Sequence, residues 1–121
     1  MAGLEVKNVK TPEERRPFKD KGNAAVVNVG GHPVIYGTFE SGWKWSAHVK
    51  PIAGTESCQA RHVGVVHSGR IGVQHEDGTE VEIGPGEAYV IEPGHDAWVV
   101  GGERFVGFEF EQRAAEEYAK G

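Results

Sequence analysis

Residues 84–95 read GPGEAYVIEPGH. A four-residue apolar run, residues 88–91, stands here between two turn sequences, GPG before it and EPG after it. Glycine tolerates the positive φ of tight turns, and proline presets the φ of their first central position. The stretch therefore predicts a short strand with a tight turn at each end, a pattern typical of all-β domains.

The same alternation of turn residues and short apolar runs recurs elsewhere, because many of the 18 glycines fall between such runs. We expect strands over residues 24–29, 33–39, 43–49, 62–67, 70–75, 79–83, 88–91, 98–100 and 104–110. Asp77-Gly78, between two of these runs, is a strong hairpin signal. No helix-length segment separates the strands, so the sheet must be antiparallel, because parallel strands need long crossover connections. Closure into a barrel or two-sheet roll removes exposed strand edges.

The two ends of the chain differ from this pattern. Thr11, Pro12 and Glu14 fit a capping box and predict a short helical turn. Residues 111–121 favour a helix by their intrinsic propensities. We therefore divide the chain into an N-terminal arm (1–22), a β-barrel (23–110) and a C-terminal helical tail (111–121).

Composition narrows the function. The net charge of −5 over 121 residues repels nucleic acid, and the basic residues are scattered apart from Arg15 and Arg16. The single cysteine cannot form an internal disulfide, which fits a reducing compartment. The N-terminus has no apolar signal-peptide core, and no apolar run reaches the roughly 18 residues of a membrane span. We expect a cytoplasmic protein that binds a small molecule rather than nucleic acid or a membrane.

Histidines are the main candidates for a functional site. The chain has six: His32, His48, His62, His67, His75 and His95. Side chains alternate between the two faces of a strand. His62 and His67, five residues apart, therefore cannot both point into the barrel from one regular strand. His75 adjoins the predicted hairpin turn and is expected to be exposed.

Residues 84–95 resemble the second sequence signature of the cupin superfamily, which runs Gly, five residues, Pro, one residue, Gly, two residues, His. Counted from Gly86, or from Gly94 as the last glycine, the signature histidine falls on Ala97, and this chain has His95 two residues earlier. A shift of two residues keeps the same face of a strand. The resemblance covers residues 34–110 and implies an antiparallel jelly-roll β-barrel of the cupin type.

The first cupin signature is Gly, five residues, His-x-His, three or four residues, Glu, six residues, Gly. Gly42 and His48 match its beginning, and Lys50 stands at its second histidine. After an insertion, His62 lies seven residues before Gly69, at the position of the signature glutamate.

The resemblance implies that His48, His62 and His95 hold a divalent metal. Imidazole ligands favour iron, nickel, copper or zinc over magnesium and calcium. Such a site would belong to a metal-dependent enzyme acting on a small polar molecule, and cupins include oxygenases, isomerases and lyases.

A second register of the first signature remains open. It places Glu56 and Cys58 on the two histidine positions, with His62 again on the glutamate. Cys58 would then be a thiolate ligand or a reactive thiol. A lone cysteine can equally be a small buried hydrophobic residue.

The alternative function is a metal-free binding or sensor module for a small anionic ligand, lined by Lys50, Arg61 and the histidines. Cys58, Tyr89 and Trp98 are further candidates for ligand contact. Asp96 could orient a histidine or cap the turn beside it.

Two of the three tryptophans are expected on the outside. Trp43 and Trp45 would share a face of the predicted strand 43–49 that His48 does not. An outward apolar stripe on a barrel, together with the family resemblance, predicts a homodimer.

Overall fold

The computed structural model describes residues 3–12, 14–17, 21–48, 50 and 56–110. The predicted C-terminal helix (111–121) lies outside the described residues. Within them, the elements are β1 (Glu14–Pro17), β2 (Gly22–Val29), β3 (His32–Phe39), α1 (Trp45–His48), β4 (His62–Ser68), β5 (Arg70–His75), β6 (Glu80–Ile83), β7 (Ala88–Ile91), β8 (His95–Val100) and β9 (Phe105–Glu109). No helix in this part of the chain has the length and apolar character needed to cross a membrane.

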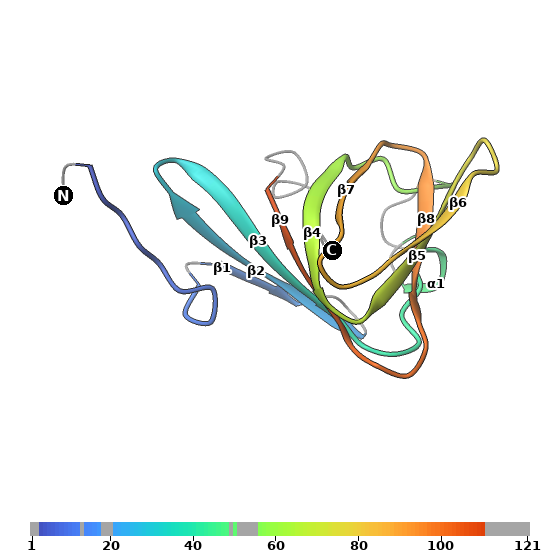
Figure 1. Ribbon diagram of the computed structural model, residues 1–121, viewed down its shortest axis with the longest axis horizontal. Helices are drawn as coiled ribbons and strands as arrows, with labels where there is room; N and C mark the ends of the chain where they lie inside the picture. Colours follow the sequence, from blue (N-terminus) through green and yellow to red (C-terminus); the bar gives the residue numbers. More distant parts are fainter. Residues whose placement is uncertain (1–2, 13, 18–20, 49, 51–55, 111–121) are drawn as a thin grey trace.

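The strands form two antiparallel sheets, which confirms the predicted all-β architecture (Figure 1). The larger sheet has the strand order β1-β2-β3-β9-β4-β7, and the smaller has β6-β5-β8. The main hydrophobic cluster contains Phe39, Trp43, Trp45, Val66, Ile71, Val73, Ile83, Ala97, Val99 and Phe105. Because its members come from strands of both sheets, burial of this cluster holds the two sheets together.

Glycine turns carry the chain from strand to strand. Gly86 and Gly94, the two glycines that bracket β7, have φ values of +82° and +97°. Gly69, with φ +77°, joins β4 of the larger sheet to β5 of the smaller one. A Cβ atom there would lie 2.3 Å from the carbonyl oxygen of Arg104, so only glycine fits this crossing. The hairpin expected at Asp77-Gly78 joins β5 to β6, as predicted.

The predicted N-terminal helical turn is wrong. The side chain of Asn8 accepts a hydrogen bond from the backbone N–H of Lys10 (2.8 Å), and the Thr11 N–H donates to the carbonyl of Asn8 (3.0 Å). These bonds close a turn before Thr11, where the capping box would begin. The chain then continues as β1, which pairs with the edge of β2. Part of the predicted N-terminal arm thus belongs to the larger sheet.

The strand predicted over residues 43–49 is also wrong, because α1 replaces it. A carboxylate oxygen of Asp96, on β8, accepts a hydrogen bond from the backbone N–H of Ser46 (3.0 Å) at the start of this single helical turn. Trp43 and Trp45 are each only 5% exposed and belong to the core, and Trp43 stacks on Phe39. The outward tryptophan stripe therefore does not exist.

Candidate metal site

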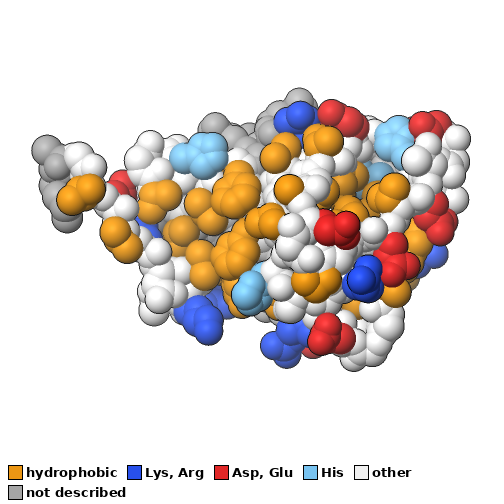
Figure 2. Space-filling view, in the orientation of Figure 1, with side chains coloured by type: hydrophobic (Ala, Val, Ile, Leu, Met, Phe, Trp, Pro, Cys, Tyr) orange, Lys and Arg blue, Asp and Glu red, His pale blue; other side chains and the backbone are white. Residues whose placement is uncertain are grey.

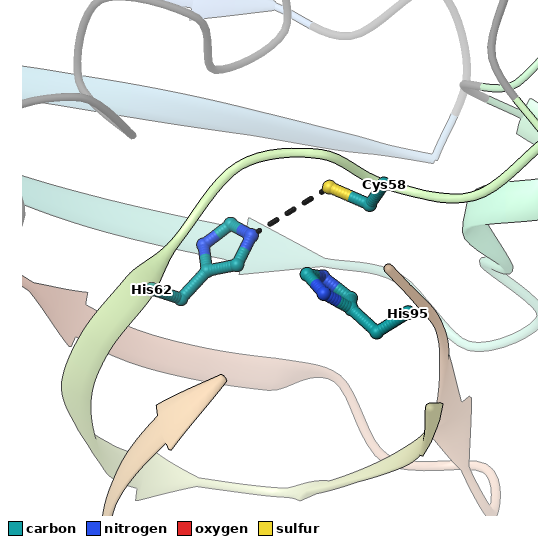
Figure 3. Close-up of side chains that lie close together, drawn as sticks. All are labelled: Cys58, His62 and His95. Carbon is teal, nitrogen blue, oxygen red and sulfur yellow. Dashed lines mark hydrogen bonds between the residues drawn. The ribbon is translucent and has the colours of Figure 1, made fainter. Parts of the chain in front are cut away.

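Cys58, His62 and His95 converge between the two sheets. Each offers one ligand atom, and these atoms all lie within 4.8 Å of one another. Figure 3 shows the two imidazole rings and the thiol pointing toward a common centre. Both histidines are buried and Cys58 is half-buried. In the described part of the chain, this is the one group of three or more such residues close enough to hold a metal.

Strand alternation explains the directions of the two histidines. On β8, His95, Ala97 and Val99 are buried and the residues between them are less so. His95 thus points inward like Ala97, the position of the signature histidine. His62 begins β4, where it also lies on the buried face.

Backbone pairing places Cys58 beside His95. The Cys58 N–H donates to the carbonyl of His95, and the Gly94 N–H donates to the carbonyl of Cys58, each over 2.7 Å. This isolated bridge ties the segment before β4 to the start of β8. The thiol therefore reaches the histidines from a third segment.

A buried carboxylate holds His62. Glu109, on β9, lies with Oε1 2.8 Å from His62 Nδ1, and its Oε2 accepts a hydrogen bond of 2.7 Å from the Tyr89 hydroxyl. An ionised carboxylate only accepts hydrogen bonds, so Nδ1 of His62 carries the proton. The other ring nitrogen, Nε2, faces Cys58 Sγ at 3.7 Å.

His95 is oriented in the same way by the backbone. Its Nδ1 lies 2.8 Å from the carbonyl oxygen of Glu92, which only accepts, so Nδ1 donates and Nε2 keeps its lone pair. The rings of His62 and His95 meet edge to face, with centroids 5.1 Å apart. Both histidines thus have the tautomer and orientation that a ligand imidazole needs.

Before a metal binds, the site favours a Cys58 thiolate next to a cationic His62 imidazole, and His62 must release its Nε2 proton to become a metal ligand. Burial raises the pKa of Cys58, but hydrogen bonds and charge from His62 and His95 outweigh burial and lower that pKa to about 6. Burial lowers the pKa of His62, but Glu109 and Cys58 outweigh it and raise that pKa to about 10. Burial, together with the nearby Glu109 charge, raises the pKa of Tyr89, which keeps its phenol protonated. A thiolate is the form of cysteine that binds metals.

The donor set fits a transition metal. Bonds of about 2.0–2.3 Å in a tetrahedral site place ligand atoms roughly 3.5 Å apart. Cys58 Sγ and His62 Nε2 are already close to this separation, so the cluster needs only a small contraction. Three protein ligands also leave one coordination position open, as in catalytic zinc sites.

The structure does not bring His48 into this cluster. His48 ends α1, where its Nδ1 lies 3.0 Å from the backbone nitrogen of Lys44. Cys58, from the alternative register, takes the third place instead. The other residue of that register, Glu56, is exposed and pairs with Lys50 over 2.9 Å. The Lys50 ammonium lowers the pKa of Glu56.

The remaining candidates lie around the cluster. Tyr89 reaches it through Glu109 and also lines a groove of about 420 Å³ between β6 and β7. Trp98 packs over Gly72, where a Cβ atom would lie 2.5 Å from the indole ring. Asp96 starts α1, as described above. His75 is half-buried, and its Nε2 lies 2.9 Å from the carbonyl oxygen of Pro93.

Sequence reasoning missed Glu109. Its signal is a lone carboxylate in the apolar run FVGFEF (residues 105–110), at a position that strand alternation places on the inner face. A buried carboxylate in such a run requires a partner, which is here His62.

Comparisons with known proteins identify the fold. No protein-family model and no curated protein matches this sequence. A sugar phosphate isomerase of the cupin superfamily from Silicibacter pomeroyi superposes with a TM-score of 0.61 at 14% identity, over 87% of this chain and 73% of the other. A protein with a double-stranded β-helix domain from Klebsiella pneumoniae gives 0.55 at 19% identity, over 88% and 83% of the two chains.

A third structure, a protein from Vibrio parahaemolyticus, gives a TM-score of 0.59 at 15% identity and covers 81% of this chain and 97% of the other. Identities this low carry the fold rather than the function. The chain therefore has the cupin fold, a double-stranded β-helix, as the sequence resemblance implied.

Proposed function

We propose that this cupin-fold protein binds one divalent transition metal through Cys58, His62 and His95 and acts as a metal-dependent enzyme on a small polar molecule. The observation that carries the proposal is the convergence of one thiol and two imidazoles within 4.8 Å. Their orientation supports it, since both histidines use Nδ1 as a donor and turn Nε2 inward. This combination is typical of metal ligands in proteins.

The ligand chemistry favours iron, nickel, copper or zinc. A thiolate and two imidazoles are softer donors than the oxygen ligands that magnesium and calcium prefer. When bound, such a metal supplies a Lewis acid that polarises a substrate oxygen or activates water. The chain itself orients His62 through Glu109 and keeps the neighbouring Tyr89 phenol protonated.

The groove between β6 and β7 is the proposed route for the substrate, because Tyr89 lines it and also contacts Glu109. Its carboxylate-bearing lining residues are Asp77, Glu82, Glu87 and Glu92. This lining does not favour an anionic ligand. The two cations of the alternative, metal-free module are each already paired with a glutamate, Lys50 with Glu56 (2.9 Å) and Arg61 with Glu92 (3.1 Å). The metal-dependent function is therefore the one that the geometry supports better.

Elemental analysis of the untagged protein tests the proposal. We expect about one transition-metal ion per chain, and Cys58→Ser, His62→Ala and His95→Ala should each lose it. His48→Ala and His75→Ala are matched controls, because both remove a histidine outside the cluster. A wild-type chain without stoichiometric metal, whose thermal midpoint is unchanged by iron, nickel, copper and zinc, would contradict the proposal. If His48→Ala were the one variant to lose the metal, the alignment in which His48 is a ligand would be supported instead.

A further inference from the structure

The larger sheet carries a polar chain on its inner face that leads from the groove to the candidate metal site. Tyr89 on β7 donates to Glu109 on β9 over 2.7 Å, and Glu109 contacts His62 on β4 over 2.8 Å. Glu109 is only 8% exposed. Each of its two carboxylate oxygens has a different partner, so the carboxylate is held from both sides.

Gly64 provides the space for this arrangement. It lies on β4 two residues after His62 and is paired with both Tyr89 on β7 and Glu109 on β9. A Cβ atom at this position would lie 2.9 Å from the Tyr89 hydroxyl and 3.0 Å from Cγ of Glu109. It would also lie 2.3 Å from the carbonyl oxygen of Phe108. Any side chain at residue 64 would displace the Tyr89–Glu109 contact or the backbone beside it.

A carboxylate buried at this position does not favour folding by itself, which suggests that it has a functional role. Burying a charge is unfavourable, and well-packed apolar residues can often replace a buried ion pair without loss of stability. The neighbouring inward residues of the same sheet, such as Ile35 and Val66, are apolar. The contact with Glu109 fixes the orientation and the tautomer of the His62 ring, with Nε2 directed at Cys58.

We propose that Glu109 is the positioning residue for His62, and that Tyr89, in the space left by Gly64, fixes Glu109 and links its position to the groove. This inference rests on the proposed metal site. Glu109 acts through His62 rather than on the metal. A molecule in the groove that contacts the Tyr89 hydroxyl would disturb the metal ligand through two hydrogen bonds.

Cobalt(II) is the probe for this positioning of His62. A thiolate–cobalt bond gives a charge-transfer absorption, and the d–d bands report ligand geometry. Wild-type chain is titrated with cobalt(II), and Kd and spectrum are compared with those of Glu109→Ala, Glu109→Gln and Tyr89→Phe. We expect Glu109→Ala to weaken binding by about 10–100-fold, as is typical for loss of a residue that orients a metal ligand. Glu109→Gln should recover part of the affinity, since its amide oxygen can still accept from His62. Tyr89→Phe should weaken binding measurably, by up to about tenfold.

The controls separate folding from positioning. Circular dichroism of each metal-free variant confirms that it is folded before titration, and Tyr89→Phe serves if Glu109→Ala does not fold. Tyr36→Phe, on the opposite face of the same sheet, should bind cobalt like the wild type. If wild type gives no thiolate–cobalt band, the proposed metal site fails. If wild type binds and Glu109→Ala matches it in Kd and spectrum, the metal site stands and the positioning role of Glu109 is overturned. If Tyr89→Phe binds cobalt with the Kd of the wild type, Tyr89 has no role in positioning Glu109.

Discussion

Each of the two faces of the larger sheet departs locally from the usual pattern. An antiparallel sheet normally presents apolar side chains to the core and polar ones to water. Here the inner face carries the polar chain of His62, Tyr89 and Glu109. The outer face carries a group that we call the outer apolar face: Val34, Tyr36, Val63, Val65, Ala88, Val90, Phe108 and Phe110.

The strand registers make the outer apolar face continuous. Tyr36 lies opposite Phe108, Phe108 opposite Val65, and Val65 opposite Ala88, so one row crosses four strands. Figure 2 shows hydrophobic side chains gathered where Figure 1 places β2, β3 and β9. Residues that break the rule of polar outside and apolar inside tend to mark functional positions. The inner polar chain belongs to the candidate metal site, and the outer apolar face is the surface on which the predicted homodimer can be tested.

Removal of the carboxylate from the inner face should have the largest effect on stability. Glu109→Ala leaves His62 buried without its partner, and breaking a buried ion pair from one side costs about 3–5 kcal/mol. Urea unfolding of the metal-free protein at pH 7 measures the loss. Glu82→Ala removes an exposed carboxylate and should change the free energy of unfolding by less than about 0.5 kcal/mol. Equal effects of the two substitutions would mean that the inner polar chain contributes nothing special.

The thiol at the end of the inner chain should titrate far below an ordinary cysteine. Because the pKa of Cys58 is lowered to about 6, its side chain should be mostly the protonated thiol at pH 5 and mostly the thiolate at pH 7 in the metal-free protein. The rate of alkylation by iodoacetamide, or thiolate absorbance at 240 nm, measures this titration. His95→Ala removes one of the stabilising groups and should move the midpoint upward. A midpoint near 8.5 in the wild type, the value of a free cysteine, would contradict the prediction.

The smallest expected effect concerns the outer apolar face. None of its eight residues is charged, so two acidic chains could pack these faces together without opposing like charges. The homodimer thus stays a prediction, with this face replacing the buried tryptophans as its interface. Val90→Lys should weaken dimerisation by about tenfold or more, which sedimentation velocity measures.

Val81→Lys is the matched control for this prediction. Val90 is 55% exposed on β7 of the larger sheet, and Val81 is 48% exposed on β6 of the smaller one. A lysine on β6 should leave association unchanged. Wild-type protein that sediments at 13.1 kDa at all concentrations would rule out the dimer, and equal effects of the two lysines would rule out this interface.

The sequence by itself determined the features that depend on local chemistry. The turns at GPG, EPG and Asp77-Gly78 follow from the backbone freedom of glycine and the fixed φ of proline. The spacing of two residues between His95 and Ala97 places both on the same face of a strand, because the side-chain period of a strand is two. Together with the resemblance to the cupin signatures, these features predict the cupin fold, with His62 and His95 as candidate ligands and Cys58 as the ligand of the alternative register.

Only the tertiary structure decided the partners of those residues. Cys58 meets His95 through a backbone bridge between separate segments, and Glu109 meets His62 across 47 positions of the chain. The contact of Asp96 with Ser46 likewise starts a helix where local alternation predicts a strand. Such contacts depend on strand order and register, which are set by how the two sheets pack. The spacing of residues along one strand carries no record of them.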